Sequence, residues 1–300
     1  MKFIKINEVL YPIPDIKFGI EIECYNLKSR GEVSGRLFTG VDITRHNDKV
    51  ARYVDENSDW IVSEERTCKN EGNLMGWEYI SPKLEGEEGV KNLVEFCGRL
   101  NKIEPIVNEK TGLHINIDTS KWSHINCAHR SVALYLAFHK VQDIMFAMCD
   151  TSRQNNLEFR KIEYSEDKKE SEDDFVRKIS KIAYYSGAIS AKDLKDKGNI
   201  EFRFFNGNLN SQEILYQTYI CSKMVSIVME KLDDYSKKNS KKIMEKNING
   251  YTLLGFVKNI NFNDLADKIF SDKKAQDYWN KKRKEHGHNI ELKNCQRSIV

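Results

Sequence analysis

Two glutamates separated by a single residue stand in the stretch FGIEIE at residues 18–23. Successive side chains of a β-strand point to opposite faces, so Glu21 and Glu23 share one face while Ile20 and Ile22 share the other. Two carboxylates on one face fit an ordinary solvent-exposed strand face. They also fit a binding face on which a cation offsets their repulsion.

Three later stretches alternate in the same way: GWEYISP at 76–82, TGLHINID at 111–118 and NIEFRFFNG at 199–207. Each has a strongly apolar face, and the polar faces carry Glu78, then His114, Asn116 and Asp118, then Glu201 and Arg203. Taken singly, these residues fit a structural histidine and a surface ion pair. If the strands are neighbours in one sheet, however, several glutamates and one histidine meet in one place. Carboxylate oxygens with one imidazole favour Mg²⁺ or Mn²⁺ over zinc.

Composition limits the class of protein. The chain has 300 residues, of which 40% are hydrophobic and 31% charged, which is typical of one large globular domain or of a domain with an appendage. The net charge of +3 argues against strong attraction of the whole protein to nucleic acid. Residues 1–15 lack the apolar run of a signal peptide, and the most apolar stretch is interrupted by His139 and Lys140, so we expect no membrane contact.

The seven cysteines are odd in number, and no two have the C-x-x-C spacing. This disfavours both a disulfide framework and a cysteine zinc site. We therefore expect reduced thiols and a cytoplasmic location.

Strands with helices between them predict an α+β fold around a mostly antiparallel sheet. The spacing of apolar residues and the capping box of Asn210 and Glu213 predict helices at 87–103, 126–149 and 211–232. Residues 52–62 are predicted to form a strand, a turn and a strand, and residues 26–50 a loop or an irregular hairpin.

The acidic segment 161–178 is predicted to be a solvated helix or loop, with a lid over the site as the alternative. From residue 236 the chain becomes rich in lysine. We therefore predict a catalytic domain over residues 1–235 and a lysine-rich helical extension over 236–300. The pair of histidines in EHGH at 285–288 is expected to be solvent-exposed rather than to bind a metal ion.

The stretches FGIEIE, WEYISPKLEG, TGLHINID and IEFRFFNGNL occur in this order. Because of these stretches and their order, the chain resembles the putative amidoligase family of carboxylate–amine ligases over roughly residues 16–230. Two further segments are similar to family motifs: DTSRQNN at 150–156 to a serine–arginine–x–x–asparagine segment, and DENS at 55–58 to an aspartate–x–serine turn, with one extra residue. The resemblance implies a sheet of the glutamine synthetase and glutamate–cysteine ligase type, with helices packed on its outer face.

The resemblance also implies roles for individual residues. The implied metal ligands are Glu21, Glu23, Glu78, His114 and Glu201. Arg203 would face phosphate, and Arg153 would hold phosphate or a substrate carboxylate. His114 and Asn116 would join Arg203 in binding the nucleotide, although Asn116, at a position that is histidine or asparagine in the family, cannot titrate near neutral pH. Asp55 is a candidate for the base that deprotonates the amine.

The segment KIAYYSGAIS at 181–190 matches the family pattern poorly, which leaves one substrate contact unassigned.

The resulting hypothesis is an ATP- and Mg²⁺- (or Mn²⁺-) dependent ligase that forms an amide or isopeptide bond through an acyl phosphate. Its substrates would be carboxylates and amines of small molecules, peptides or proteins. One alternative is a phosphotransferase of the guanidino-kinase type on the same fold. Another is a non-enzymatic nucleic-acid- or protein-binding module that uses the basic tail, where residues 271–300 hold eight Lys and Arg against four Asp and Glu. The sequence contains neither a G-x-x-x-x-G-K-[ST] nor a G-x-G-x-x-G motif, and it does not indicate the oligomeric state.

Overall fold

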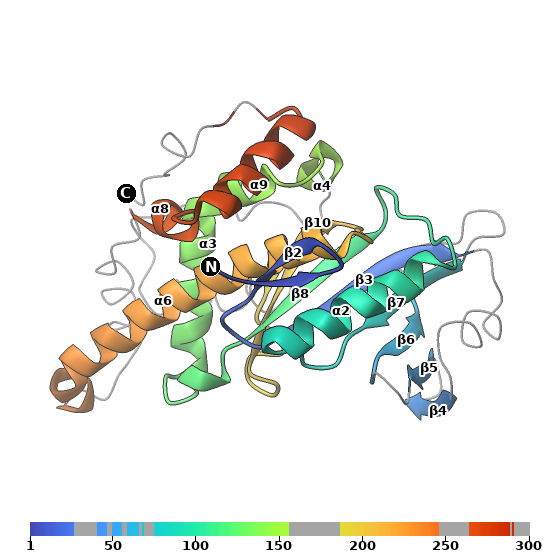
Figure 1. Cartoon of the computed structure of the whole chain (residues 1–300). Coiled ribbons are helices and arrows are strands. Elements are labelled where there is room, and N and C mark those ends of the chain that lie inside the picture. The colour runs from blue at the N-terminus through green and yellow to red at the C-terminus, as the bar shows by residue number, and fades with distance from the viewer. Residues whose placement is uncertain are drawn as a thin grey trace. The chain divides into compact units, whose positions relative to one another are not determined.

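The computed structural model describes residues 1–26, 41–46, 50–55, 59–65, 68, 75–155, 187–245, 264–288 and 290 (Figure 1). Internal contacts group the chain into two compact units. The first unit comprises Met1–Asn116 with Phe205–Tyr219, and the second comprises Ile117–Phe204 with Ile220–Val300.

One eight-stranded sheet and one two-stranded sheet lie within the described residues. The larger sheet has the order β4 (Val41–His46), β5 (Val50–Asp55), β6 (Ile61–Glu64), β7 (Met75–Ile80), β3 (Phe18–Asn26), β8 (Gly112–Asp118), β10 (Asn199–Asn206) and β9 (Ile189–Ser190). The smaller sheet pairs β1 (Lys2–Ile6) with β2 (Val9–Ile13). The four strands predicted to carry the polar residues, β7, β3, β8 and β10, are therefore consecutive.

The strands pair antiparallel wherever their register is defined. β3 pairs antiparallel with β7, β7 with β6, β6 with β5 and β5 with β4. Next to β8 and β10, Gly207 N donates to Thr111 O at 3.0 Å within the first unit, and Thr119 N donates to Gly198 O at 2.7 Å within the second. Together with the helices, this confirms the predicted α+β class. The glutamine synthetase-like arrangement stays a prediction.

The three predicted helices form, and one of them is much longer than predicted. They are α2 (Gly86–Asn101), α3 (Cys127–Phe146) and α6 (Ser211–Glu245). The last helix was predicted to end near residue 232, but α6 continues to Glu245. One reason is the i,i+4 ion pair between Lys237 and Asp233 at 2.7 Å, which supports another turn in a segment with a weak apolar pattern.

Two other predicted segments are only partly described. For residues 26–50, the hairpin alternative holds where β4 pairs with β5, since His46 is opposite Val50. Residues 27–40 and 47–49, the turn at 56–58 and the acidic segment 161–178 lie outside the described residues.

In the first unit, helix α2 runs alongside strands β3 and β7 (Figure 1). The ring of Phe96 in α2 stacks on Trp60 with centroids 3.6 Å apart and lies 5.9 Å from the ring of Tyr79 in β7. The indole Nε1 of Trp60 also donates to Asn92 Oδ1 at 2.7 Å. Burial of each such aromatic side chain contributes about 1.5–3 kcal/mol. These contacts cover the apolar face of the strands with α2, and the alternation of side chains puts the polar face on the other side.

In the second unit, α3 is the core helix that the sequence predicted. The ring of Phe138 lies 6.2 Å from that of Phe202 and 5.4 Å from that of Phe204, and Phe146 lies 5.0 Å from Phe204. Phe202 and Phe204 of β10 thus pack into the core, as their alternation with Glu201 predicted. No helix in the described part of the chain is both long enough and apolar enough to cross a membrane.

Two short helices, α8 (Leu265–Ile269) and α9 (Lys273–Glu285), lie in the predicted extension and belong to the second unit. They are helical, as predicted, and α9 buries Ala275, Tyr278 and Trp279. The division of the chain at residue 235 stays a prediction.

Candidate metal centre

Three predicted metal ligands converge on the polar face of the first unit. In the antiparallel register of β3 and β7, Glu23 is directly opposite Glu78. His114 reaches them from β8, with its Nε2 atom 3.5 Å from Glu23 Oε1. One ligand atom from each of these three residues lies within 4.8 Å of the other two. The strand alternation that the sequence showed therefore does bring these side chains together.

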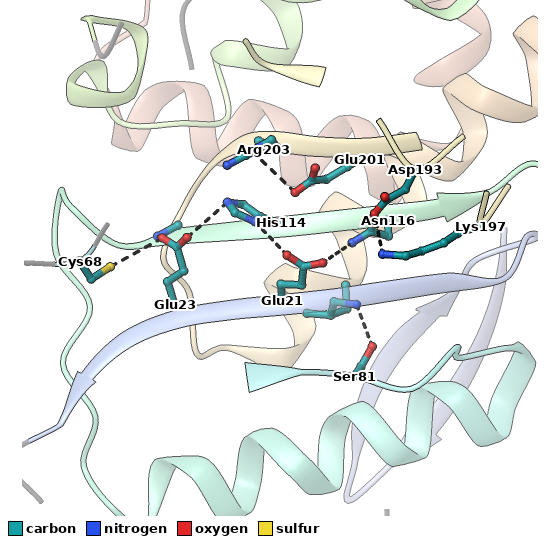
Figure 2. Close-up of polar contacts among 12 residues, drawn as sticks. Glu21, Glu23, Cys68, Ser81, His114, Asn116, Asp193, Lys197, Glu201 and Arg203 are labelled. Carbon is teal, nitrogen blue, oxygen red and sulfur yellow. Dashed lines mark hydrogen bonds and ion pairs between the residues drawn. The ribbon is translucent and has the colours of Figure 1, made fainter. Parts of the chain in front are cut away.

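Glu21 joins this group through the other nitrogen of the same imidazole. His114 Nδ1 lies 3.1 Å from Glu21 Oε2, and Asn116 Nδ2 donates to Glu21 Oε1 at 2.9 Å (Figure 2). The buried His114 ring thus stands between two glutamates, with one ring nitrogen toward each. Asn116, which cannot titrate, fixes the orientation of Glu21.

The second oxygen of Glu23 has a different set of partners. Gly112 N donates to Glu23 Oε2 at 2.6 Å, and the Cys68 thiol lies 3.9 Å from the same oxygen. Sequence reasoning missed both contacts. The Gly112 contact comes from a main-chain N–H, which almost every residue type has, so the sequence does not mark it. Cys68 lies outside all the alternating stretches. These contacts occupy Oε2, so Oε1 is the oxygen that faces His114.

The electrostatics of the group reflect crowding of negative charge. The pKa of Glu78 is raised from 4.5 to about 8, chiefly by burial and then by the charge of Glu21, while His114 acts in the opposite direction. Without a cation, Glu78 therefore holds its proton at neutral pH. A bound cation would favour the ionised carboxylate and displace that proton.

The donor set suits a small divalent ion. Mg²⁺ binds oxygen ligands at about 2.1 Å in octahedral geometry, which places ligand atoms roughly 3–4 Å apart. The ligand atoms of Glu23, Glu78 and His114 need only a small closure to reach that spacing. Two carboxylates and one imidazole fit Mg²⁺ or Mn²⁺. Such an ion would also offset the repulsion between the two glutamates, because like charges directly opposite each other in a sheet are destabilising.

The other predicted residues belong to the second unit or have side chains outside the described residues. Glu201 and Arg203 share one face of β10 in the second unit, with Arg203 Nε 3.7 Å from Glu201 Oε1. Arg153 is fully buried in the short helix α4 (Thr151–Asn155) of the same unit. Asp55 ends β5, but its side chain lies outside the described residues, so its role as a base stays a prediction.

The sequence model of the family described as "putative amidoligase enzyme" matches residues 14–225. The chain belongs to this amidoligase family. None of the curated proteins compared with the chain matches it.

The amidoligase match covers the polar face completely. It includes every residue predicted to bind metal, phosphate or substrate, from Glu21 to Arg203. It begins after β2 and ends within α6, so that α8 and α9 lie outside it. The family relationship therefore supports a ligase-type enzyme and leaves the role of α8 and α9 open.

Proposed function

We propose that this protein is an ATP- and Mg²⁺-dependent ligase that joins a carboxylate to an amine. The observation that carries the proposal is the convergence of Glu23, Glu78 and His114, with Glu21 on the far side of the imidazole. Membership of the amidoligase family supports the ligase class. The substrates proposed are carboxylates and amines of small molecules, peptides or proteins.

The reaction needs ATP because the oxygen of a carboxylate is a poor leaving group in water near pH 7. Attack of a carboxylate oxygen on the γ-phosphorus of ATP forms an acyl phosphate and releases ADP. The amine nitrogen then attacks the acyl carbon, the bond from that carbon to the phosphate oxygen breaks, and inorganic phosphate leaves. The amine loses one proton to a base, for which we propose Asp55.

Phosphoryl transfer depends mainly on positioning and on neutralisation of charge. Glu23, Glu78 and His114, together with Glu21 and Glu201, would hold the divalent cations, which when bound neutralise charge on the triphosphate. Asn116 keeps Glu21 oriented, and Gly112 N keeps Glu23 oriented. Arg203 and Arg153 would bind phosphate or carboxylate oxygens through the planar guanidinium fork.

The proposal is tested with purified protein, MgCl₂, ATP and a mixture of amino acids, polyamines and short peptides. ADP release is measured together with mass spectrometry for a product equal to acid plus amine minus one water. A carboxylate labelled with ¹⁸O should transfer one ¹⁸O atom to the released phosphate, which is the signature of an acyl phosphate. Glu78→Gln should abolish the reaction, and Glu95→Gln, on the exposed side of α2, should not.

The alternatives give different results in the same assay. ADP release with a phosphorylated product and no condensed product would replace the ligase by the phosphotransferase. Unchanged activity of Glu78→Gln would show that this face is not the active site.

A further inference from the structure

Helix α9 is anchored to the end of the core helix α3. The indole Nε1 of Trp279 donates to Ile144 O at 2.8 Å, and Trp279 is 1% exposed. Ile144 lies in the last turn of α3, where main-chain carbonyls lack the next helical turn as a partner. The ring of Phe270 lies 5.8 Å from that of Trp279 and packs beside it. A buried side chain of α9 thus satisfies a main-chain group at the end of α3.

Two histidines that follow α9 contact the residues that follow α3. His288 Nε2 lies 3.0 Å from Cys149 O, and His286 Nδ1 lies 3.9 Å from Asp150 Oδ2. The side chain of His286 is only 23% exposed. The two histidines of the EHGH stretch, expected to be solvent-exposed, are therefore partly buried, His288 against the Cys149 carbonyl and His286 against the Asp150 side chain.

The two histidines do not form a metal site in this structure. The groups of residues whose ligand atoms converge within the described part of the chain do not include Asp150, His286 and His288. The Nε2 atom of His288 is also engaged with a carbonyl oxygen. The contacts therefore favour positioning of the main chain over metal binding.

Asp150 is the residue that starts helix α4. Its Oδ1 atom accepts a hydrogen bond from Ser152 N at 2.8 Å, and its carbonyl oxygen accepts one from Arg153 N at 3.1 Å. Such contacts satisfy the free N–H groups of a first helical turn and fix where the helix begins. Arg153 is 0% exposed and lies in the first turn of α4, so the start of the helix fixes the position from which its side chain extends.

We propose that α9 is a positioning element for Arg153. Trp279, His286 and His288 hold the segment from Ile144 to Asp150 and thereby fix the position of Arg153 at the start of α4. This inference rests on the proposed function, because Arg153 is taken as an anion-binding residue there. The inference assigns a role to α9, which lies outside the family match. In this role His286 and His288 do not touch the substrate, and they act only through Arg153.

The test uses the full chain and two readouts. The first is hydrogen–deuterium exchange of the amides at 150–155, which reports on the start of α4 and needs no activity. The second is the Kd for adenylyl imidodiphosphate with MgCl₂. The double variant His286→Ala/His288→Ala is compared with His286→Asn/His288→Gln, which keeps a nitrogen near each contact, and with Lys284→Ala, an exposed position of α9.

We expect the double alanine variant to exchange about tenfold faster at 150–155 and to bind the analogue about tenfold more weakly. The asparagine/glutamine variant should recover most of both effects, and Lys284→Ala should show neither. In an Arg153→Lys background the alanine pair should weaken binding by less than about twofold, because the residue through which they act has been changed.

Three results would overturn the inference: unchanged exchange at 150–155, unchanged affinity, or an equal loss of affinity in both backgrounds. Failure of the proposed function looks different. In that case the wild-type chain does not bind the nucleotide at all, and the anion-binding role of Arg153 falls with it.

Discussion

Glu23 of β3 lies directly opposite Glu78 of β7 in an antiparallel pair. The Cβ atoms of directly opposed residues are about 4.5–5.5 Å apart, and like charges in such positions are destabilising. Ser63 of β6 is opposite Glu78 on its other side and brings no positive charge. Two glutamates in this register therefore create a conflict that either a proton or a cation must resolve.

The first prediction concerns the pH dependence of the metal-free protein. Burial and neighbouring carboxylates raise the pKa of Glu78 to about 8 in the folded state, against 4.5 in the unfolded chain. The folded state thus retains a proton that the unfolded state has already released. The contribution to stability is fully present below about pH 4.5 and is lost progressively as the pH rises from there through 8, so Tm should fall between about pH 5 and 8 and level off above that range.

Glu78→Gln provides the control for this prediction, because an amide cannot titrate. The Tm of the variant should change less over the same pH range, and the difference between the two curves isolates Glu78 from other groups. Parallel curves would show that Glu78 titrates normally. With saturating Mg²⁺, the rise in Tm of the wild type should grow with pH, since the cation competes with a proton for this carboxylate.

The second prediction is stabilisation by metal and nucleotide. A ligand that binds only the folded state at a hundredfold excess over its Kd stabilises it by about 2.7 kcal/mol. Thermal unfolding with MgCl₂ and ATP should therefore show a higher Tm than unfolding in EDTA. Glu23→Gln should remove most of the shift, whereas Glu95→Gln, an exposed residue of α2, should retain it. Equal shifts in both variants would contradict a metal site at Glu23.

The third prediction separates catalysis from stability on β10. Arg203 and Glu201 are 3.7 Å apart and partly exposed, so their attraction contributes only about 0–1 kcal/mol to folding. Arg203→Lys keeps the charge but loses the planar fork, and we expect the rate to fall by about 10²–10³ with little change in Tm.

Phe202→Leu should do the reverse. Phe202 is fully buried against Phe138, and the substitution should cost roughly 1 kcal/mol of stability while the rate changes little. Measured kcat and Tm for both variants check the pair of expectations. Full activity of folded Arg203→Lys would remove this residue from the proposed site.

The fourth prediction concerns Trp279. Trp279→Phe keeps most of the ring but leaves Ile144 O without its donor, which should cost about 1–3 kcal/mol in the free energy of unfolding. Asp277→Asn, which breaks an exposed 2.9 Å ion pair with Lys273 in the same helix, should cost less than about 1 kcal/mol. The urea midpoints of the two variants give the comparison. Similar small shifts would mean that α9 is only loosely attached to α3.

The sequence was informative where the alternation of side chains along a strand shows which residues share one face of the sheet. Alternation in β3, β7, β8 and β10 predicted the apolar residues that are buried and the polar residues that share the opposite face, because the period of a strand is two. The fold class followed from the order of these elements. Their pairing order and register did not, since pairing joins residues far apart in the chain. The opposition of Glu23 and Glu78 could only be seen in the structure.

The attachment of α9 was missed for a related reason. Its lysine-rich composition indicated a helical extension, and composition does not show that Trp279 donates a hydrogen bond to a carbonyl of α3. Strand β1, strand β2 and the short β9 were also not predicted, because they lack the carboxylate, imidazole and guanidinium pattern that marked the other strands. Local patterns identified residues of the candidate site, and non-local packing supplied the elements that support it.

The hydrogen bond from Gly112 N to Glu23 Oε2 has a consequence for how this protein can diverge during evolution. Every residue type except proline carries a main-chain N–H, so most replacements at position 112 that preserve the strand also preserve this donor. The orientation of Glu23 is therefore protected against mutational drift at the position that maintains it. Distant relatives can share this constraint on Glu23 without sharing the glycine, and a search for matching side chains would not detect what they have in common.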